Sequence, residues 1–202
     1  ENVVALARNI GYVPRSRKAA AATISFFVDL TQITPAPSTL TLKKGVVCSS
    51  QSSFGSESFV FSIVEDITVP VVNNTASFNE ITVYEGTLVE SNFTFSSQNP
   101  NQKFILDNSG IDTETIRVSV KNNQSATASV KYSYQDNILH ITDTSNVFYL
   151  QEIEDERYEM FFGDGVFGRK LEESNYVTAA YITSNGDSAN GLGQFAYSGI
   201  LE

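Results

Sequence analysis

The 202-residue sequence is poor in the residue types that most often carry chemistry, with one cysteine (Cys48), one histidine (His140) and no tryptophan. A single cysteine cannot form an internal disulfide, so nothing indicates an oxidising compartment. One histidine and one cysteine also supply too few nitrogen and sulfur ligands for a zinc site. No apolar run reaches about 18 residues, and no signal peptide is recognisable, so the sequence predicts neither a membrane-spanning helix nor secretion.

Basic residues are also scarce, because 13 Lys and Arg stand against 23 Asp and Glu, which gives a net charge of −10. Binding to a phosphate backbone requires clustered Lys and Arg, so this balance argues against nucleic acid as the main partner. The apolar fraction of 41% is ordinary for a globular protein. The chain begins at Glu1 without a Met, which we interpret as a piece of a longer protein, and Leu201-Glu202 as a possible expression scar.

The first residues have the pattern of a short helix. In residues 2–9 the apolar side chains follow a three-and-four spacing, and Gly11 and Pro14 then end the pattern. Leu6 and Ile10 would give this helix an apolar face that docks on a neighbouring subunit or packs on its own domain. The basic cluster Arg15, Arg17 and Lys18 is interpreted as a solvated linker.

After Ala22 the apolar residues alternate with polar ones, which is typical of half-buried strands. About a dozen short strands separated by Ser, Asn, Asp and Gly clusters predict a mainly β fold of antiparallel, sandwich-like sheets. Weak helix signals occur at 145–153 and 170–175. Domains are expected at residues 1–92 and 93–202, with the boundary in the polar stretch around Pro100. The predicted strands are 24–30, 40–42, 46–48, 59–64, 81–84, 93–95, 104–106, 116–120, 130–134, 138–142, 147–150, 158–162 and 176–182, with 130–134 and 138–142 forming a hairpin.

The segment Phe162-Gly-Asp-Gly-Val-Phe-Gly168 contains the Gly-x-Gly-x-x-Gly spacing of dinucleotide-binding sites. That motif functions where its glycines open a helix inside a βαβ unit, and no such unit surrounds this segment. A phosphate-binding P-loop is excluded too, because Arg169 stands at the lysine position. One carboxylate, Asp164, is too little for a dedicated calcium site. We interpret the segment as a structural turn in which Gly165 supplies a positive φ and Asp164 accepts backbone hydrogen bonds.

The remaining reactive residues form no catalytic pattern. His140 falls in a predicted strand and is interpreted as a structural histidine, and Cys48 as a passive thiol. The acidic run at residues 152–156 is interpreted as a solvated turn, although it could hold a cation. No Gly-x-Ser-x-Gly nucleophile elbow occurs. The sequence therefore predicts no catalytic, cofactor-binding or metal-binding residues and no enzymatic activity.

Two separated stretches carry a resemblance to a known family. The first is Ala5-Leu-Ala-Arg-Asn-Ile-Gly-Tyr-Val-Pro14, followed by small residues at 19–22 and a strand at 23–28. The second runs from Val147-Phe-Tyr-Leu-Gln-Glu152 through the Phe-Gly-Asp-Gly turn to a strand at 176–181 and the turn at 185–191. Their order and spacing resemble the baseplate J-like family, the baseplate wedge proteins of contractile-tailed bacteriophages.

The resemblance implies a structural component of a phage tail baseplate wedge, located in the virion and assembled in the host cytoplasm. It implies partners among other baseplate wedge proteins and further copies of the same chain, without nucleic acid, membrane insertion or cofactors. Two alternatives remain. A β-sandwich binding module, such as an adhesin or carbohydrate-binding domain, would show exposed aromatic residues over a shallow groove. A hydrolase would gather His140 with carboxylates in a pocket.

Overall fold

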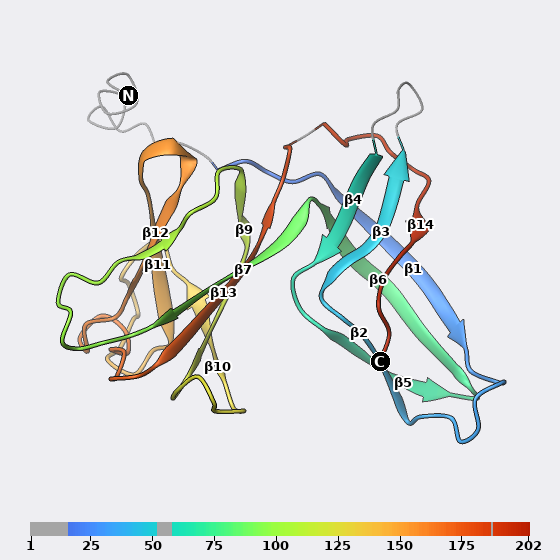
Figure 1. The fold of residues 1–202 in the computed structure, drawn as a ribbon, viewed down its shortest axis with the longest axis horizontal. Helices are drawn as coiled ribbons and strands as arrows, with labels where there is room; N and C mark the ends of the chain where they lie inside the picture. Colours follow the sequence, from blue (N-terminus) through green and yellow to red (C-terminus); the bar gives the residue numbers. More distant parts are fainter. Residues whose placement is uncertain (1–15, 52–57, 187) are drawn as a thin grey trace. The chain divides into compact units, whose positions relative to one another are not determined.

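The structure, a computed structural model, describes residues 16–51, 58–186 and 188–202, and in this part of the chain the fold is mainly β, as predicted (Figure 1). Two sheets form, in the orders β14-β3-β4-β6-β5-β2, with β1 also paired to β6, and β7-β13-β9-β10-β11-β12-β8. The strands are β1 (Ala21–Asp29), β2 (Thr39–Leu42), β3 (Gly45–Gln51), β4 (Ser58–Ile63), β5 (Ile67–Val72), β6 (Thr75–Glu85), β7 (Thr87–Thr94), β8 (Phe104–Leu106), β9 (Ile111–Lys121), β10 (Val130–Tyr134), β11 (Val147–Glu152), β12 (Tyr158–Phe162), β13 (Tyr176–Thr183) and β14 (Ala196–Tyr197).

The chain divides into two compact units. The central unit contains Val89–Tyr181, together with Ser16 and Arg17 among the described residues, and the flanking unit contains Lys18–Leu88 and Ile182–Glu202. The chain thus passes between units at residues 17–18, 88–89 and 181–182, whereas the division into domains at residues 92–93 stays a prediction. The predicted helix at residues 2–9, with Leu6 and Ile10, lies outside the described residues.

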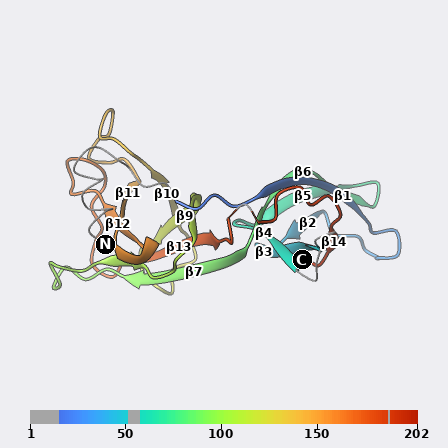
Figure 2. The same cartoon turned by 90° about the horizontal axis from the view of Figure 1, so that it is seen from above.

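In the flanking unit, β1 pairs along its length with β6 in antiparallel register (Figure 2). Ile24, Phe26 and Val28 are half-buried and alternate with exposed residues, as the period-two pattern predicts. A bulge interrupts the register between Ile24 and Phe26, where Glu80 adopts a φ of 53°. The backbone N–H of Glu80 donates to Ser25 Oγ at 2.9 Å, so the bulge keeps its donor satisfied.

The β5–β6 hairpin was not predicted from the sequence. Its two-residue turn is Asn73-Asn74, and both residues have positive φ, 51° and 58°. Those values are typical of a type I′ turn, whose twist matches that of antiparallel strands. Asparagine tolerates this conformation well, so the signal was present in the Asn-Asn pair between two β-branched runs.

The core of the flanking unit contains Leu42, Phe61, Phe78 and Val83, all fully buried. Phe26 stacks on Phe78 with ring centroids 4.9 Å apart. Cys48 lies in this core, where burial raises the pKa of its thiol. A buried thiol with a raised pKa is a poor nucleophile, which agrees with the interpretation of Cys48 as passive.

Glu85, at the end of β6, is a buried carboxyl group in the flanking unit. Its Oε2 accepts hydrogen bonds from Ser184 Oγ at 2.7 Å and from the Asn185 backbone N–H at 3.1 Å, and its Oε1 accepts from Asn185 Nδ2 at 3.2 Å. The Glu85 backbone N–H donates to the Ala20 carbonyl. This one residue therefore connects three chain segments that lie far apart in the sequence.

The central unit packs β8 to β13 around its own core. Tyr181 is fully buried, and its hydroxyl donates to Asn108 Oδ1 at 2.6 Å and lies 3.0 Å from Ser91 Oγ. A buried phenol requires such partners, so Tyr181 has both a packing and a hydrogen-bonding role. The buried residues of this core are Phe104, Leu106, Ile111, Ile116, Val118, Val120, Tyr132, Phe148, Tyr158, Met160, Leu171, Val177, Ala179 and Tyr181.

The predicted hairpin between residues 130–134 and 138–142 is wrong. β10 pairs in parallel with β11, and residues 135–146 form a connecting loop of turns. A parallel pair requires a connection of about a dozen residues, so a tight turn cannot make it. His140 consequently lies in this loop, exposed and with a φ of 63°, instead of in a strand.

The structure has no helix at either of the two weak helix signals, residues 145–153 and 170–175, apart from the 3-10 turn at Glu154–Glu156 that borders the first. Residues 147–152 form the strand β11, and residues 170–175 contain a turn before β13. Among the described residues the structure has one 3-10 turn, Glu154–Glu156, and β14 was not predicted.

Replacing the buried carboxylate of Glu85 tests its connecting role. Glu85→Gln should lower the free energy of unfolding by about 1–3 kcal/mol, because an amide NH₂ would then face groups that donate. Glu80→Gln, the same change at an exposed position, should have almost no effect. Urea denaturation of both variants measures this, and equal stability of Glu85→Gln and the wild type would contradict the role.

Candidate assembly site

The Phe-Gly-Asp-Gly segment follows β12 and forms a compact turn at residues 163–168. Asp164 Oδ1 accepts the backbone N–H groups of Val166 at 2.8 Å and Phe167 at 2.9 Å. The Gly165 N–H donates to the Gly168 carbonyl at 3.0 Å. The segment is therefore a structural turn stabilised by Asp164.

The backbones at Gly163 and Gly168 approach each other too closely for any side chain. A Cβ atom on Gly163 would overlap the backbone of Gly168, and one on Gly168 would lie 2.6 Å from a Val147 methyl carbon. Gly168 also has a φ of 101°, which L-residues rarely adopt. A Cβ atom on Gly165, which has a φ of 92°, would meet only Lys170 Cβ at an ordinary 3.9 Å, so this position requires glycine for its conformation alone.

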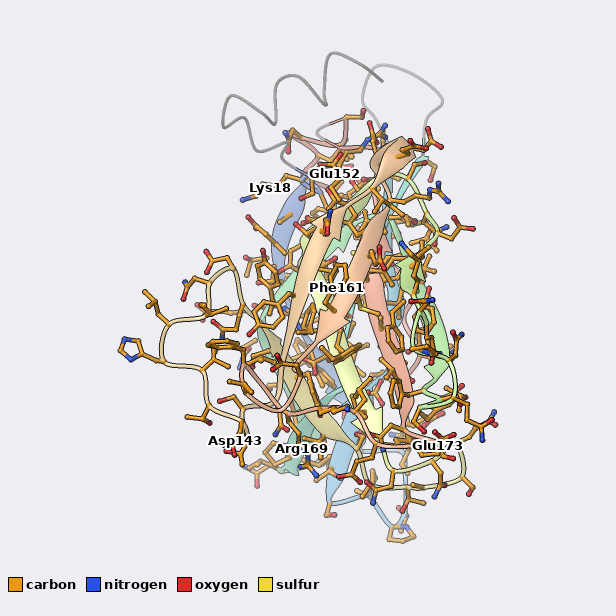
Figure 3. The ribbon with its side chains drawn as sticks, turned by 90° about the vertical axis from the view of Figure 1, so that its left-hand side faces the viewer. Lys18, Asp143, Glu152, Phe161, Arg169 and Glu173 are labelled. Carbon is orange, nitrogen blue, oxygen red and sulfur yellow. The ribbon has the colours of Figure 1, made fainter. Side chains whose placement is uncertain are left out.

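The turn is attached to the loop that connects β10 to β11. The Gly168 N–H donates to the Thr142 carbonyl at 3.0 Å, and the Arg169 N–H donates to the Ser145 carbonyl at 2.8 Å. In Figure 3, Asp143 and Arg169 lie near each other at one end of the unit, with Glu152 toward the opposite end. These two backbone hydrogen bonds join loops from distant parts of the sequence into one structure.

Both joined loops expose large apolar side chains. Leu139 is 71% exposed and Ile138 53% in one loop, while Val166 is 63% and Phe167 44% exposed in the other. We call these four residues the apolar loop pair. They lie on two loops that backbone hydrogen bonds join at Thr142 and Ser145.

The electrostatics of the turn favour an ionised Asp164. Hydrogen bonds from the N–H groups of Phe167 and then Val166 lower the pKa of the Asp164 carboxyl group below its ordinary value of 3.8. The charged turn is therefore fully formed at neutral pH.

The other reactive residues form no site in the described part of the chain. Exposed His140 and buried Cys48 belong to different units, and no group of three or more His, Cys, Asp or Glu residues there could hold a metal ion. In the acidic run, Glu156 forms an ion pair with Arg17 at 3.4 Å. No helix among the described residues is long and apolar enough to cross a membrane.

The sequence predicted the turn but not the apolar loop pair. Ile138 and Leu139 were assigned to a strand, and Val166 and Phe167 were treated only as spacers between glycines. One signal was available in the sequence. Each loop has two adjacent apolar residues between turn-forming residues. In a strand, two adjacent side chains point to opposite faces, so only one of each pair would be buried.

Comparison with known families matches the chain to "Bacteriophage baseplate wedge protein gp6, third domain" over residues 87–188. That range covers half of the chain and includes both the turn and the loop joined to it. The chain belongs to the bacteriophage baseplate wedge protein family. This wedge protein accordingly has a structural role in the phage baseplate, in the virion tail, and interacts with other baseplate proteins. No curated protein matches its sequence.

Two glycines of the wedge protein's turn, Gly163 and Gly165, should differ in their tolerance of alanine. Gly163→Ala should destabilise by about 2–3 kcal/mol because the methyl group meets backbone, and Gly165→Ala by about 1 kcal/mol through its positive φ. Gly193→Ala, at a glycine with open space and ordinary φ, should stay within about 0.5 kcal/mol of the wild type. Thermal or urea unfolding ranks them, and equal values for Gly163→Ala and Gly193→Ala would refute the close approach.

The turn should also respond to acid. Because the folded pKa of Asp164 is lowered, the stabilisation from its carboxylate is present above the unfolded pKa and is lost as pH falls through the folded pKa. Amide chemical shifts of Val166 and Phe167 should therefore titrate with a midpoint below 3.8. Asp164→Asn should abolish that titration, and a midpoint at or above the ordinary value would contradict the hydrogen-bonded turn.

Proposed function

We propose that this chain is a non-enzymatic structural part of the baseplate wedge that assembles with other wedge proteins and further copies of itself into the ring around the tail hub. The observation that carries the proposal is the family match over residues 87–188, which coincides with the ordered turn and its attached loop. The resemblance of the Phe-Gly-Asp-Gly region to baseplate J-like proteins supports the same role. Assembly in the host cytoplasm is part of this proposal.

The apolar loop pair is the surface proposed for assembly. A subunit of a large complex requires surfaces that are covered only in the complex, and apolar side chains gain most from being covered. Here backbone hydrogen bonds at Thr142 and Ser145 join the two loops, so less backbone entropy should be lost when a partner binds. A preordered apolar loop pair of this kind favours affinity for a partner protein without a large buried area.

The proposal is tested by charging the loop pair in the full-length wedge protein. Leu139→Asp and Phe167→Asp should reduce wedge formation with the partner proteins at least tenfold, measured by sedimentation, while the thermal melt stays within a few degrees of the wild type. Val130→Asp, at an exposed position on β10, is the matched control and should assemble normally. Normal assembly of both loop variants would show that the contact lies elsewhere.

A further inference from the structure

The flanking unit has a groove beside β1. It has a volume of about 710 Å³ and is lined by Cys48, Phe195, Tyr197, Leu201 and every residue of Ile24 to Asp29. Successive side chains of a strand point to opposite faces of its sheet. A groove that is touched by six consecutive residues therefore runs along the edge of β1 and not over one face.

That edge is open in the part of the chain that the structure describes. β1 pairs with β6 on one side, and no other described strand pairs with it. Across the groove, β14 pairs with β3 and with no other strand of the described residues, while the residues after it bond to β2 and β3 through Leu201 and Ser198. Two strand edges thus border one groove, and each has backbone groups available for a further strand.

β1 lacks the features by which proteins protect an exposed edge. Its nine residues contain no lysine and no proline, and the one bulge in its pairing lies on the β6 side. Phe27, on its outward face, is 72% exposed. An unprotected edge of this length promotes strand addition, so its persistence indicates that a partner covers it.

We propose that the edge of β1 accepts an extended, basic peptide segment of another wedge protein as an added strand, an inference that rests on the proposed assembly function. The backbone of the added strand would pair with β1, and its alternate apolar side chains would enter the groove beside Phe26 and Tyr197.

Charge decides between the possible occupants. Asp29 is the one carboxylate in the groove lining, and hydrogen bonds from Thr31 lower the pKa of its side chain, which keeps it ionised. The whole chain carries a net charge of −10, so a basic segment is attracted to it and a second copy of the chain is repelled. A carbohydrate is less suited than a strand, because six consecutive strand residues line the groove with few polar side chains.

The first test uses a synthetic peptide of alternating valine and threonine with a lysine at each end, added to the full chain. Binding should be saturable and should protect the amides of residues 21–29 from hydrogen exchange. Two control peptides carry N-methyl groups on alternate amides, one on the odd-numbered and the other on the even-numbered residues. At least one of them should bind at least tenfold more weakly than the unmethylated peptide. Absence of saturable binding, protection elsewhere, or binding of both methylated peptides as tight as that of the unmethylated peptide overturns the proposal.

Matched variants locate the binding. Phe27→Lys and Asp29→Lys should each weaken peptide binding at least tenfold, whereas Val72→Lys, at an exposed position on β5 outside the groove, should not change it. Thermal melts verify that all three variants fold. Protection of β1 that grows with the concentration of the chain alone would assign the edge to a second copy and refute the proposal.

Hydrogen exchange of the amides of residues 21–29 in the assembled wedge distinguishes failure of this inference from failure of the proposed function. If the wild-type protein enters the wedge and residues 21–29 become protected, both stand. If it assembles and these amides exchange as in the free chain, strand addition is wrong while the assembly function is unaffected. If the wild-type protein does not assemble, the proposed function fails, whatever the peptide shows.

Discussion

The close approach of Gly163 to Gly168 is the constraint on which the proposed assembly surface depends. Because neither residue has a Cβ atom, the chain leaving β12 can cross itself and return toward β11 beside Val147. The crossing directs the N–H groups of Gly168 and Arg169 to the loop at residues 142–145. Without it, the two exposed apolar loops would be separate and each would be free to move.

This arrangement explains why a motif with the spacing of a nucleotide site serves another purpose here. In dinucleotide-binding proteins the glycines let a backbone approach a pyrophosphate at a helix N-terminus. In this chain they let the backbone approach itself, and Asp164 occupies the donors of Val166 and Phe167 that an anion would otherwise meet. The same conformational freedom of glycine here permits the close approach of two backbone segments.

The local part of the fold could be predicted from the sequence. The alternation of Ile24, Phe26 and Val28 indicated β1 because side-chain period depends only on neighbouring residues. The parallel pairing of β10 with β11 could not be predicted, since nothing in residues 130–142 encodes a partner that lies beyond a twelve-residue loop. The strand edge beside Phe27 and the burial of Glu85 likewise depend on contacts between distant segments.

For the candidate site too, one part could be predicted from the sequence and the other could not. The turn around Asp164 follows from short-range chemistry, and its glycines were recognisable as conformational requirements. The loops that carry Leu139 and Phe167 are joined only through hydrogen bonds between segments more than twenty residues apart in sequence. Residue type alone does not say whether such apolar residues enter a core or remain exposed for a partner.

Native-state hydrogen exchange of the Gly168 and Arg169 amides in the free chain tests the central claim most directly. If the crossing orders the apolar loop pair before any partner binds, these two amides should exchange nearly as slowly as those of β11 and β12. Exchange as fast as in an unstructured loop would mean that the surface is not preformed, and would contradict this account of how the wedge protein presents it.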